Sequence, residues 1–168
     1  MKNPFKFFYR KRISFLINYF YNESDNFERK NKLLRKTGIK IGDGTQICGP
    51  LHNKAKLIIG NHVFIGRNFN VEGNGQVIIE DNCNIGPNVT IITGSHLAGD
   101  SNRRAGEGFN CNVVIKKGSW ICANVIISTN VVIGLGNIVA AGSVVIESTP
   151  DNVMVAGVPA QVKKTLIK

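Results

Sequence analysis

The chain is poor in acidic residues, in cysteine and in long apolar runs, and each shortage excludes a class of protein. Its 168 residues include 21 Lys and Arg but only 11 Asp and Glu, for a net charge of +10. The four cysteines form no CxxC pair and have no histidine at metal-ligand spacing, which favours reduced thiols in a cytoplasmic protein. No apolar run reaches the roughly 20 residues that a membrane-spanning helix needs. No small-residue cleavage site follows the short apolar run 13–21, which argues against a signal peptide.

Positive charge and aromatic residues are concentrated at the N-terminus. Residues 1–40 carry 11 Lys and Arg against 3 Asp and Glu, whereas residues 41–168 carry 10 against 8. Nine of the 13 aromatic residues lie within the first 27 positions. The pattern predicts a helical arm over residues 1–37, with Ser24 or Asp25 capping its second helix and Gly38 ending it.

Two interpretations of this arm remain open. It packs its aromatic face on the rest of the chain or on a neighbouring subunit, or it lies on the surface of an anionic membrane. Nucleic-acid binding is disfavoured because the chain behind the arm offers no basic groove.

Between residues 41 and 145, an aliphatic residue recurs at every sixth position over long stretches. The heads of these hexads are Ile41, Ile47, Ile59, Ile65, Val71, Ile79, Ile85, Ile91, Ile115, Ile121, Ile127, Ile133, Val139 and Val145. A period of six predicts a solenoid in which three hexads close one triangular coil and stacked coils form three parallel sheets. Glycine recurs at the second place, and small or β-branched residues occupy the fifth. The predicted fold is an all-β solenoid, a left-handed parallel β-helix, since a β-sandwich would show period-two alternation instead.

The repeat is interrupted by residues 97–114, between His96 and Ile115. Eighteen residues equal one coil, so the segment is either a degenerate coil or an excursion that leaves the phase intact. Arg103 would be the inward residue of such a coil, and burying an unpaired arginine is too costly. We therefore expect an extruded loop, with an arm over 1–37, a β-helix over 38–149 and a tail over 150–168.

Four short motifs accompany the ladder: Thr-Gly-Ser-His ending at His96, Gly-Ser-Trp-Ile-Cys-Ala-Asn from Gly118, Ala-Gly-Ser-Val-Val ending at Val145, and Ala-Gly-Val-Pro-Ala ending at Ala160. Together they resemble the hexapeptide-repeat acyltransferases, in the branch of the maltose, galactoside and colanic-acid O-acetyltransferases. The resemblance implies a homotrimer with acetyl-CoA as co-substrate, no metal, and an active site in the groove between adjacent subunits.

By the same resemblance, His96 is the catalytic base. A neutral imidazole near pH 7 can take the proton of a sugar hydroxyl as the hydroxyl attacks the thioester, and no acyl-enzyme is needed. Asp100, Glu107 or a backbone carbonyl are candidates to hold the tautomer of the ring. The alternative is that His96 is a solvent-exposed turn residue with no catalytic role.

For the cofactor, the family motifs place the pantetheine contacts on Ala123 and Ala141, with Trp120 beside the cleft and Lys163 and Lys164 near the phosphates. Trp120 is equally suited to packing at a subunit interface, and the two lysines to remaining solvated. A second basic residue of the family is replaced here by the Ile-Glu pair at 146–147, which weakens that contact.

The acceptor side departs from the family pattern. Where relatives carry an Asn-Phe-Asn run, residues 66–68 read Gly-Arg-Asn, and the family's acidic contact falls on Asn74. Asn68, Asn74 and the loop residue Arg103 are therefore the candidate acceptor contacts, and we expect the acceptor not to be the same simple disaccharide as in those relatives.

The resulting expectation is an O-acetyltransferase that acetylates a hydroxyl of a sugar or polysaccharide precursor, in the cytoplasm or on the inner face of the membrane. The alternatives are an N-acetyltransferase for an amino-sugar nucleotide and a non-catalytic trimeric scaffold. A carbonic anhydrase of the same fold needs three clustered histidine ligands. His52, His62 and His96 are separated by 10 and 34 residues, which does not gather them, so His52 and His62 are expected to be surface residues.

Overall fold

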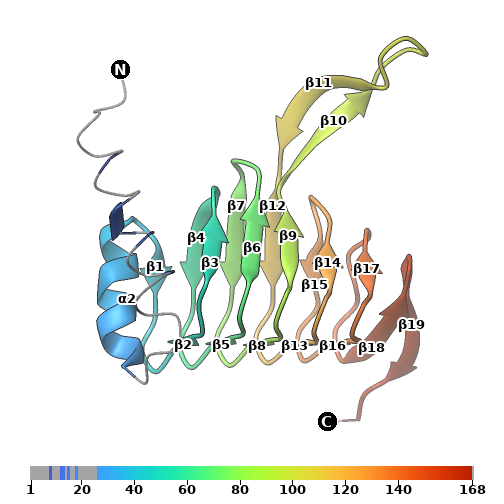
Figure 1. Cartoon of the computed structure of the whole chain (residues 1–168). Coiled ribbons are helices and arrows are strands. Elements are labelled where there is room, and N and C mark those ends of the chain that lie inside the picture. Colours follow the sequence, from blue (N-terminus) through green and yellow to red (C-terminus); the bar gives the residue numbers. More distant parts are fainter. Residues whose placement is uncertain (1–7, 9–11, 14, 16–17, 19–25, 168) are drawn as a thin grey trace.

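The structure, a computed structural model, describes residues 26–167 continuously (Figure 1). Of the first 25 residues it describes only Phe8, Arg12, Ile13, Phe15 and Asn18, all of them helical. Most of the predicted aromatic arm, including Ser24 and Asp25, therefore lies outside the described residues.

Three parallel sheets wrap around one core, as the period of six predicts. Sheet A runs in the order β1 (Lys40–Ile41), β4 (Lys56–Ile59), β7 (Gln76–Ile79), β12 (Asn112–Ile115) and β15 (Val132–Ile133). Sheet B runs in the order β2 (Gln46–Ile47), β5 (Phe64–Ile65), β8 (Asn84–Ile85), β13 (Trp120–Ile121), β16 (Ile138–Val139), β18 (Val153–Gly157) and β19 (Ala160–Thr165). Sheet C runs in the order β3 (Leu51–Asn53), β6 (Phe69–Glu72), β9 (Thr90–Ile92), β14 (Ile126–Ile127) and β17 (Val144–Val145). We call the turns between the sheets the AB, BC and CA corners.

The residues predicted to point inward do so. The heads Ile47, Ile65, Ile85, Ile121 and Ile133 are fully buried. The small residues at the fifth place are buried as well, namely Thr45, Val63, Val89, Ser119, Val125, Val131 and Ser143. A continuous aliphatic column thus fills the inside of the stack and accounts for most of the buried apolar surface.

The turns have two backbone requirements. At the fourth place the chain adopts positive φ, which asparagine tolerates; these residues are Asn68, Asn82, Asn88, Asn124 and Asn130. At the second place glycine is needed for close approach, since a Cβ on Gly66 would lie 2.7 Å from the backbone nitrogen of Pro87.

The excursion predicted between His96 and Ile115 is an antiparallel hairpin of β10 (Gly94–Ala98) and β11 (Ala105–Asn110). It leaves the stack between β9 and β12 and projects away from the coils (Figure 1). Because β7 and β12 pair directly, no degenerate coil intervenes. The hairpin begins at Gly94, before the predicted start, and the ladder resumes at Asn112, before the predicted end.

The C-terminal segment extends sheet B. Strand β18 pairs with β16 and buries Val153 and Val155. Strand β19 then returns antiparallel along β18 and forms the edge of the sheet. Within the described part of the chain, no helix has the length and apolar character required to cross a membrane.

Helix α2 (Phe27–Lys36) covers the open end of the first coil. Its N-cap is Asn26, whose side chain accepts a hydrogen bond from the backbone N–H of Arg29. The helix ends before Gly38, at φ +97°. Asn31 donates a 2.7 Å hydrogen bond to the carbonyl of Thr45 and thereby ties the helix to the coil.

The earlier arm also contacts the first coil. Ile13 is buried in the core cluster, and the Asn18 side chain exchanges hydrogen bonds with the backbone of Leu51. These contacts support the interpretation in which the arm packs on the solenoid.

Lys30 on α2 is 1% exposed, and its Nζ has no hydrogen-bond partner among the described residues. Burial lowers the pKa of Lys30 from 10.5 to about 8, partly offset by the nearby Cys48 thiol. Below pH 8 the buried charge of Lys30 therefore lowers the free energy of unfolding. This destabilisation decreases as the pH rises from about 8 towards 10.5, because the native state then releases the proton.

We predict that Lys30→Met raises the free energy of unfolding at pH 7 by about 1–3 kcal/mol. The gain should shrink between pH 8 and 10.5, as measured by urea denaturation. Lys32→Met, on the exposed face of the same helix, is the control and should change stability little. A Lys30→Met protein that is less stable than wild type across this pH range would contradict the account.

Candidate active site

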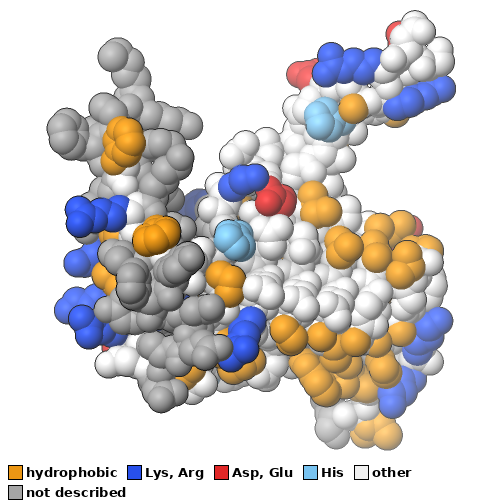
Figure 2. Space-filling model, viewed as in Figure 1, with side chains coloured by type: hydrophobic (Ala, Val, Ile, Leu, Met, Phe, Trp, Pro, Cys, Tyr) orange, Lys and Arg blue, Asp and Glu red, His pale blue; other side chains and the backbone are white. Residues whose placement is uncertain are grey.

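His96 is exposed and lies in β10, on the hairpin and not at the end of a coil hexad as the sequence predicted. It stands opposite Gly108 of β11, and a Cβ on Gly108 would contact the imidazole at 3.6 Å. The ring therefore rests over a position with no side chain. Figure 2 shows a histidine side chain, in pale blue, on the surface of the projecting hairpin.

The base of the hairpin is fixed by Thr93, which is fully buried. Its hydroxyl donates to the carbonyl of Glu72 at 2.8 Å and accepts from the N–H of Gly75 at 3.1 Å. Its carbonyl accepts from the N–H of Cys111 at 2.8 Å and from the Thr129 hydroxyl at 3.2 Å. Thr93 thus joins the two ends of the hairpin to the coils on either side, which holds His96 on a rigid base.

The hairpin stands on the turn after β6, where eight residues instead of six separate the heads Val71 and Ile79 and thus insert two residues into the preceding coil. Gly73 has φ +92°, and a Cβ there would lie 2.5 Å from the nitrogen of Gly94. The N–H of Asn74 donates to the Asn110 side chain at 2.9 Å. Asn74, a predicted site residue, is therefore held at the base of the hairpin beside Asn110, which pairs with Gly94, two residues before His96.

The loop groups proposed to orient His96 are placed differently. The carboxylate of Asp100 accepts hydrogen bonds from the N–H groups of Asn102 and Arg103, so it stabilises the turn at the tip. Arg103 is exposed at the same tip, well away from the base of the hairpin. Among the described residues, no side chain hydrogen-bonds to the His96 ring.

A strip of side chains crosses the outer face of sheet B. Trp120, which is 52% exposed, pairs in register with Ile138, Ile138 with Met154, and Met154 with Lys164. Three strand spacings separate its ends, or about 14 Å. Lys163 is exposed at the irregular position of β19 next to this strip.

Ala123 and Ala141 stack at the BC corner beside the strip. The carbonyl of Ala123 accepts a 2.9 Å hydrogen bond from the N–H of Gly142, so the two turns lie directly on one another. The structure therefore brings the five predicted cofactor residues to one elongated surface on sheet B and its BC edge.

This surface and His96 occupy different corners of the coil. His96 belongs to the CA corner, whereas Ala123 and Ala141 belong to the BC corner, with a strand of sheet C between them. Six residues separate Ala123 from Thr129 at the base of the hairpin, up to about 20 Å in extended chain. The predicted base and the predicted cofactor surface are thus not adjacent within one chain.

Asn68 is not directed to the hairpin either. At the BC corner it donates to the Asn88 side chain at 2.9 Å, and Asn88 donates to Asn124 at 3.0 Å. All three have positive φ. Asn68 is therefore part of a ladder of turn asparagines, which gives it a structural role that the sequence motif did not suggest.

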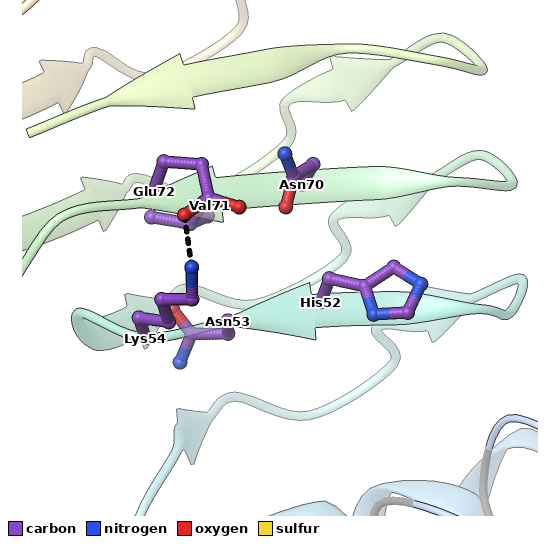
Figure 3. A pocket seen from close by; sticks show the side chains of 6 residues that line it. All are labelled: His52, Asn53, Lys54, Asn70, Val71 and Glu72. Atoms are coloured by element: carbon purple, nitrogen blue, oxygen red, sulfur yellow. Dashed lines mark hydrogen bonds and ion pairs between the residues drawn. The ribbon is translucent and has the colours of Figure 1, made fainter.

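A hollow of about 450 Å³ lies on the outer face of sheet C, beside the base of the hairpin (Figure 3). Its lining residues are His52, Asn53, Lys54, Asn70, Val71 and Glu72. Lys54 Nζ lies 2.6 Å from the Glu72 carboxylate. This hydrogen bond holds the pKa of Glu72 below its ordinary value; burial opposes the shift, and the Lys54 charge, the Asn70 side chain and the His52 charge reinforce it.

His52 is exposed, as the sequence predicts. The hollow itself was not predicted, because it forms only where adjacent coils stack in register and bring His52 beside Asn70 and Lys54 beside Glu72, each pair 18 residues apart. His62 is indeed exposed, at a turn position with φ +53°.

Comparison with known proteins identifies the family. No family model matches the chain. Over 141 residues it is 30% identical to the galactoside O-acetyltransferase of Escherichia coli K12, covering 80% of this chain and 68% of that protein. The structure of a hexapeptide-repeat acetyltransferase of Vibrio cholerae, complexed with acetyl-CoA, aligns with a TM-score of 0.83 at 29% identity, covering 98% and 89% of the two chains.

A galactoside acetyltransferase solved with coenzyme A aligns equally well, with a TM-score of 0.83 at 26% identity over 98% and 82% of the chains. The chain therefore belongs to the hexapeptide-repeat acetyltransferases, and the predicted left-handed β-helix is confirmed. It is an acetyltransferase of that family.

Proposed function

We propose that the protein transfers an acetyl group from acetyl-CoA to a hydroxyl of a sugar or glycan, with His96 as general base. The observation that carries this proposal is the placement of His96: it is exposed on a hairpin whose base Thr93 ties to the coils. The acetyl-CoA and coenzyme A bound by the two solved relatives, and the acceptor named for the galactoside enzyme, support the choice of donor and acceptor.

The reaction needs one proton transfer at His96. The imidazole takes the proton of the acceptor hydroxyl as its oxygen attacks the thioester carbonyl; the C–O bond forms, the C–S bond breaks, and the proton passes to the departing thiolate. The strip from Trp120 to Lys164 supplies an extended surface for the donor, with Ala123 and Ala141 at its edge. Lys163 and Lys164 are exposed at its far end, where a phosphate would be neutralised.

The separation of the two corners favours a shared site. If three copies assemble around a threefold axis, the hairpin of one copy can reach the BC corner of the next, and the base then meets the donor across the groove. We therefore propose a homotrimer in which each site uses His96 of one copy and the sheet B surface of its neighbour. Arg103 at the hairpin tip would then lie over the neighbouring copy.

We predict that His96→Ala lowers kcat/KM for acceptor-dependent CoA release by about 10²–10⁴, the usual contribution of a general base. His62→Asn is the matched control, because asparagine occupies the equivalent positive-φ turn positions, and it should retain activity. Sugar alcohols and amino-sugar nucleotides are compared as acceptors. Full activity of His96→Ala would remove the residue from the mechanism, and turnover confined to the amino-sugar nucleotides would make the protein an N-acetyltransferase.

The arm packs on the first coil through Ile13 and Asn18, and we propose that exposed basic residues of the arm and of α2 also contact an anionic membrane, which would bring a lipid-linked acceptor to the site. Lys32 and Lys36 are exposed on α2, and Arg12 is exposed before it. Basic residues near an anionic bilayer contribute about 1 kcal/mol each.

The full-length Lys32→Glu/Lys36→Glu protein should bind anionic vesicles at least about tenfold more weakly than wild type in flotation experiments. Lys56→Glu/Lys117→Glu, at exposed positions on sheet A and the AB corner, is the control for net charge. Equal binding of the wild type to anionic and neutral vesicles would refute the membrane contact.

A further inference from the structure

Helix α2 is attached to the solenoid at the first coil, whose open end it covers (Figure 1). The Asn31 side chain donates to the carbonyl of Thr45 at 2.7 Å, and the Arg35 side chain donates to the carbonyls of Ile41 at 3.2 Å and Gly42 at 3.4 Å. All three acceptors belong to that coil. Because the terminal unit of a solenoid packs on one neighbour, it can open locally while the coils behind it stay folded.

The face that α2 buries is largely polar. Its buried residues are Lys30, Asn31 and Leu34. The Lys30 Nζ and the Asn31 Oδ1 have no hydrogen-bond partner in the part of the chain that the structure describes. Burying polar atoms without a partner is unfavourable, most of all for a charged group. The gain from burying Leu34 is therefore opposed by two polar side chains on the same face of the helix.

The surroundings of Lys30 do little to stabilise its charge. The titratable group that faces it from the first coil is the Cys48 thiol, in the turn after β2, and Glu28 of α2 pairs instead with Arg35 at 2.7 Å. Burial therefore lowers the pKa of Lys30 to about 8, and the Cys48 charge opposes part of this shift. The other charged residues of α2, of the described arm and of the start of the coil are exposed, namely Arg12, Arg29, Lys32, Lys36, Lys40 and Asp43.

The same helix has the composition of a segment that binds anionic surfaces. Five of its ten residues are Lys or Arg, against one Glu. Figure 2 shows Lys and Arg side chains, in blue, along the edge of the molecule where α2 lies in Figure 1. Near an anionic bilayer, a lysine keeps its aliphatic stem at the apolar boundary while its ammonium meets the headgroups. Such a surface offers Lys30 an anionic partner and Leu34 an apolar one.

We propose that α2 is a releasable cap, and that its buried face of Lys30, Asn31 and Leu34 is a latent binding face for anionic lipid. Protonation of Lys30 favours release of the helix from the coil, and contact with lipid favours it further. The described contacts of the arm, Ile13 and Asn18, lie at the same end of the solenoid and are released with the helix. The lipid step rests on the membrane contact proposed above, whereas the proton-linked release does not.

Hydrogen exchange of the full-length protein tests the release in the absence of lipid. Because Lys30 binds its proton more weakly in the docked helix, the equilibrium constant for release should fall about tenfold between pH 7 and pH 9, for pKa values of about 8 and 10.5. The protection factors of the α2 amides, corrected for the intrinsic pH dependence of exchange, should rise by the same factor. Amides of β13 and β16, inside the stack, should be more protected than those of α2 at both pH values, because the release is local.

Lys30→Met should hold α2 on the coil. At pH 7 its α2 amides should be at least about tenfold more protected than those of wild type, and the dependence on pH should be lost. Lys32→Met is the matched control, because it removes one charge from the exposed face of the same helix, and it should exchange as wild type does. Protection of wild-type α2 that is equal at the two pH values, pH dependence that persists in Lys30→Met, or α2 amides that exchange only together with β13 and β16 would overturn the proposal.

Thiol alkylation tests the lipid step at pH 7, with vesicles of phosphatidylserine and phosphatidylcholine compared with phosphatidylcholine alone. Release uncovers the first coil, so the anionic vesicles should speed the reaction of Cys48 with iodoacetamide at least about threefold, read by peptide mapping. Cys83, fully buried in a later coil, is the internal reference and should not respond. Lys30→Met should show a smaller response than Lys32→Met, which has the same net charge.

Two outcomes separate this inference from the membrane contact proposed above. Binding to anionic vesicles with unchanged alkylation of Cys48 would leave that contact standing and overturn the lipid step. Proton-linked release in a protein that binds neither kind of vesicle would overturn the membrane contact together with the lipid step, and would support α2 as a proton-linked cap.

Discussion

The structure depends on the return of an aliphatic side chain to the core after every six residues. Each coil buries its inward residues only against the coils above and below, so the heads and the fifth-place residues form one uninterrupted column. A residue added within a strand would turn this pattern to the solvent, whereas a residue added at a corner does not. Insertions are therefore confined to corners, and both the two-residue insertion between β6 and β7 and the hairpin between β9 and β12 occur at the CA corner, in adjacent coils.

This constraint determines where chemistry can be placed. Within the coils, inward-facing residues are needed for core packing. Several corner residues are needed to form the turns, as the hydrogen-bonded turn asparagines that include Asn68 show. What remains is the outward face of each sheet and any excursion from a corner. The chain uses both: an extended strip on sheet B, a polar hollow on sheet C, and a hairpin that carries His96 away from the coil. Thr93 links the hairpin to the hollow and to the next coil, because its hydrogen bonds join it to Glu72 and to Thr129.

The six-residue period correctly predicted the features that follow directly from the stacking of the coils. It placed the buried heads, the small residues at the fifth place and the excursion after the third coil, and the cost of burying Arg103 correctly favoured an extruded segment. Details outside the repeat were less predictable. The N-cap is Asn26, and His96 lies in a hairpin strand because Thr93 and Cys111, close together in space, end the coil earlier than the hexad count indicated. The hollow was missed because Lys54 and Glu72 become neighbours only when the coils are stacked in register.

The proposed construction of one site from two copies of the chain is tested most directly by mixing subunits. His96→Ala lacks the base but retains the sheet B surface, whereas Ala141→Trp obstructs that surface at the exposed BC corner and retains the base. Each variant alone should be inactive. Co-expressed, they should recover acceptor-dependent CoA release, because the hairpin of one variant meets the intact surface of the other. A mixed oligomer that forms but stays inactive would show that the base and the donor surface act within a single chain, and would contradict the account.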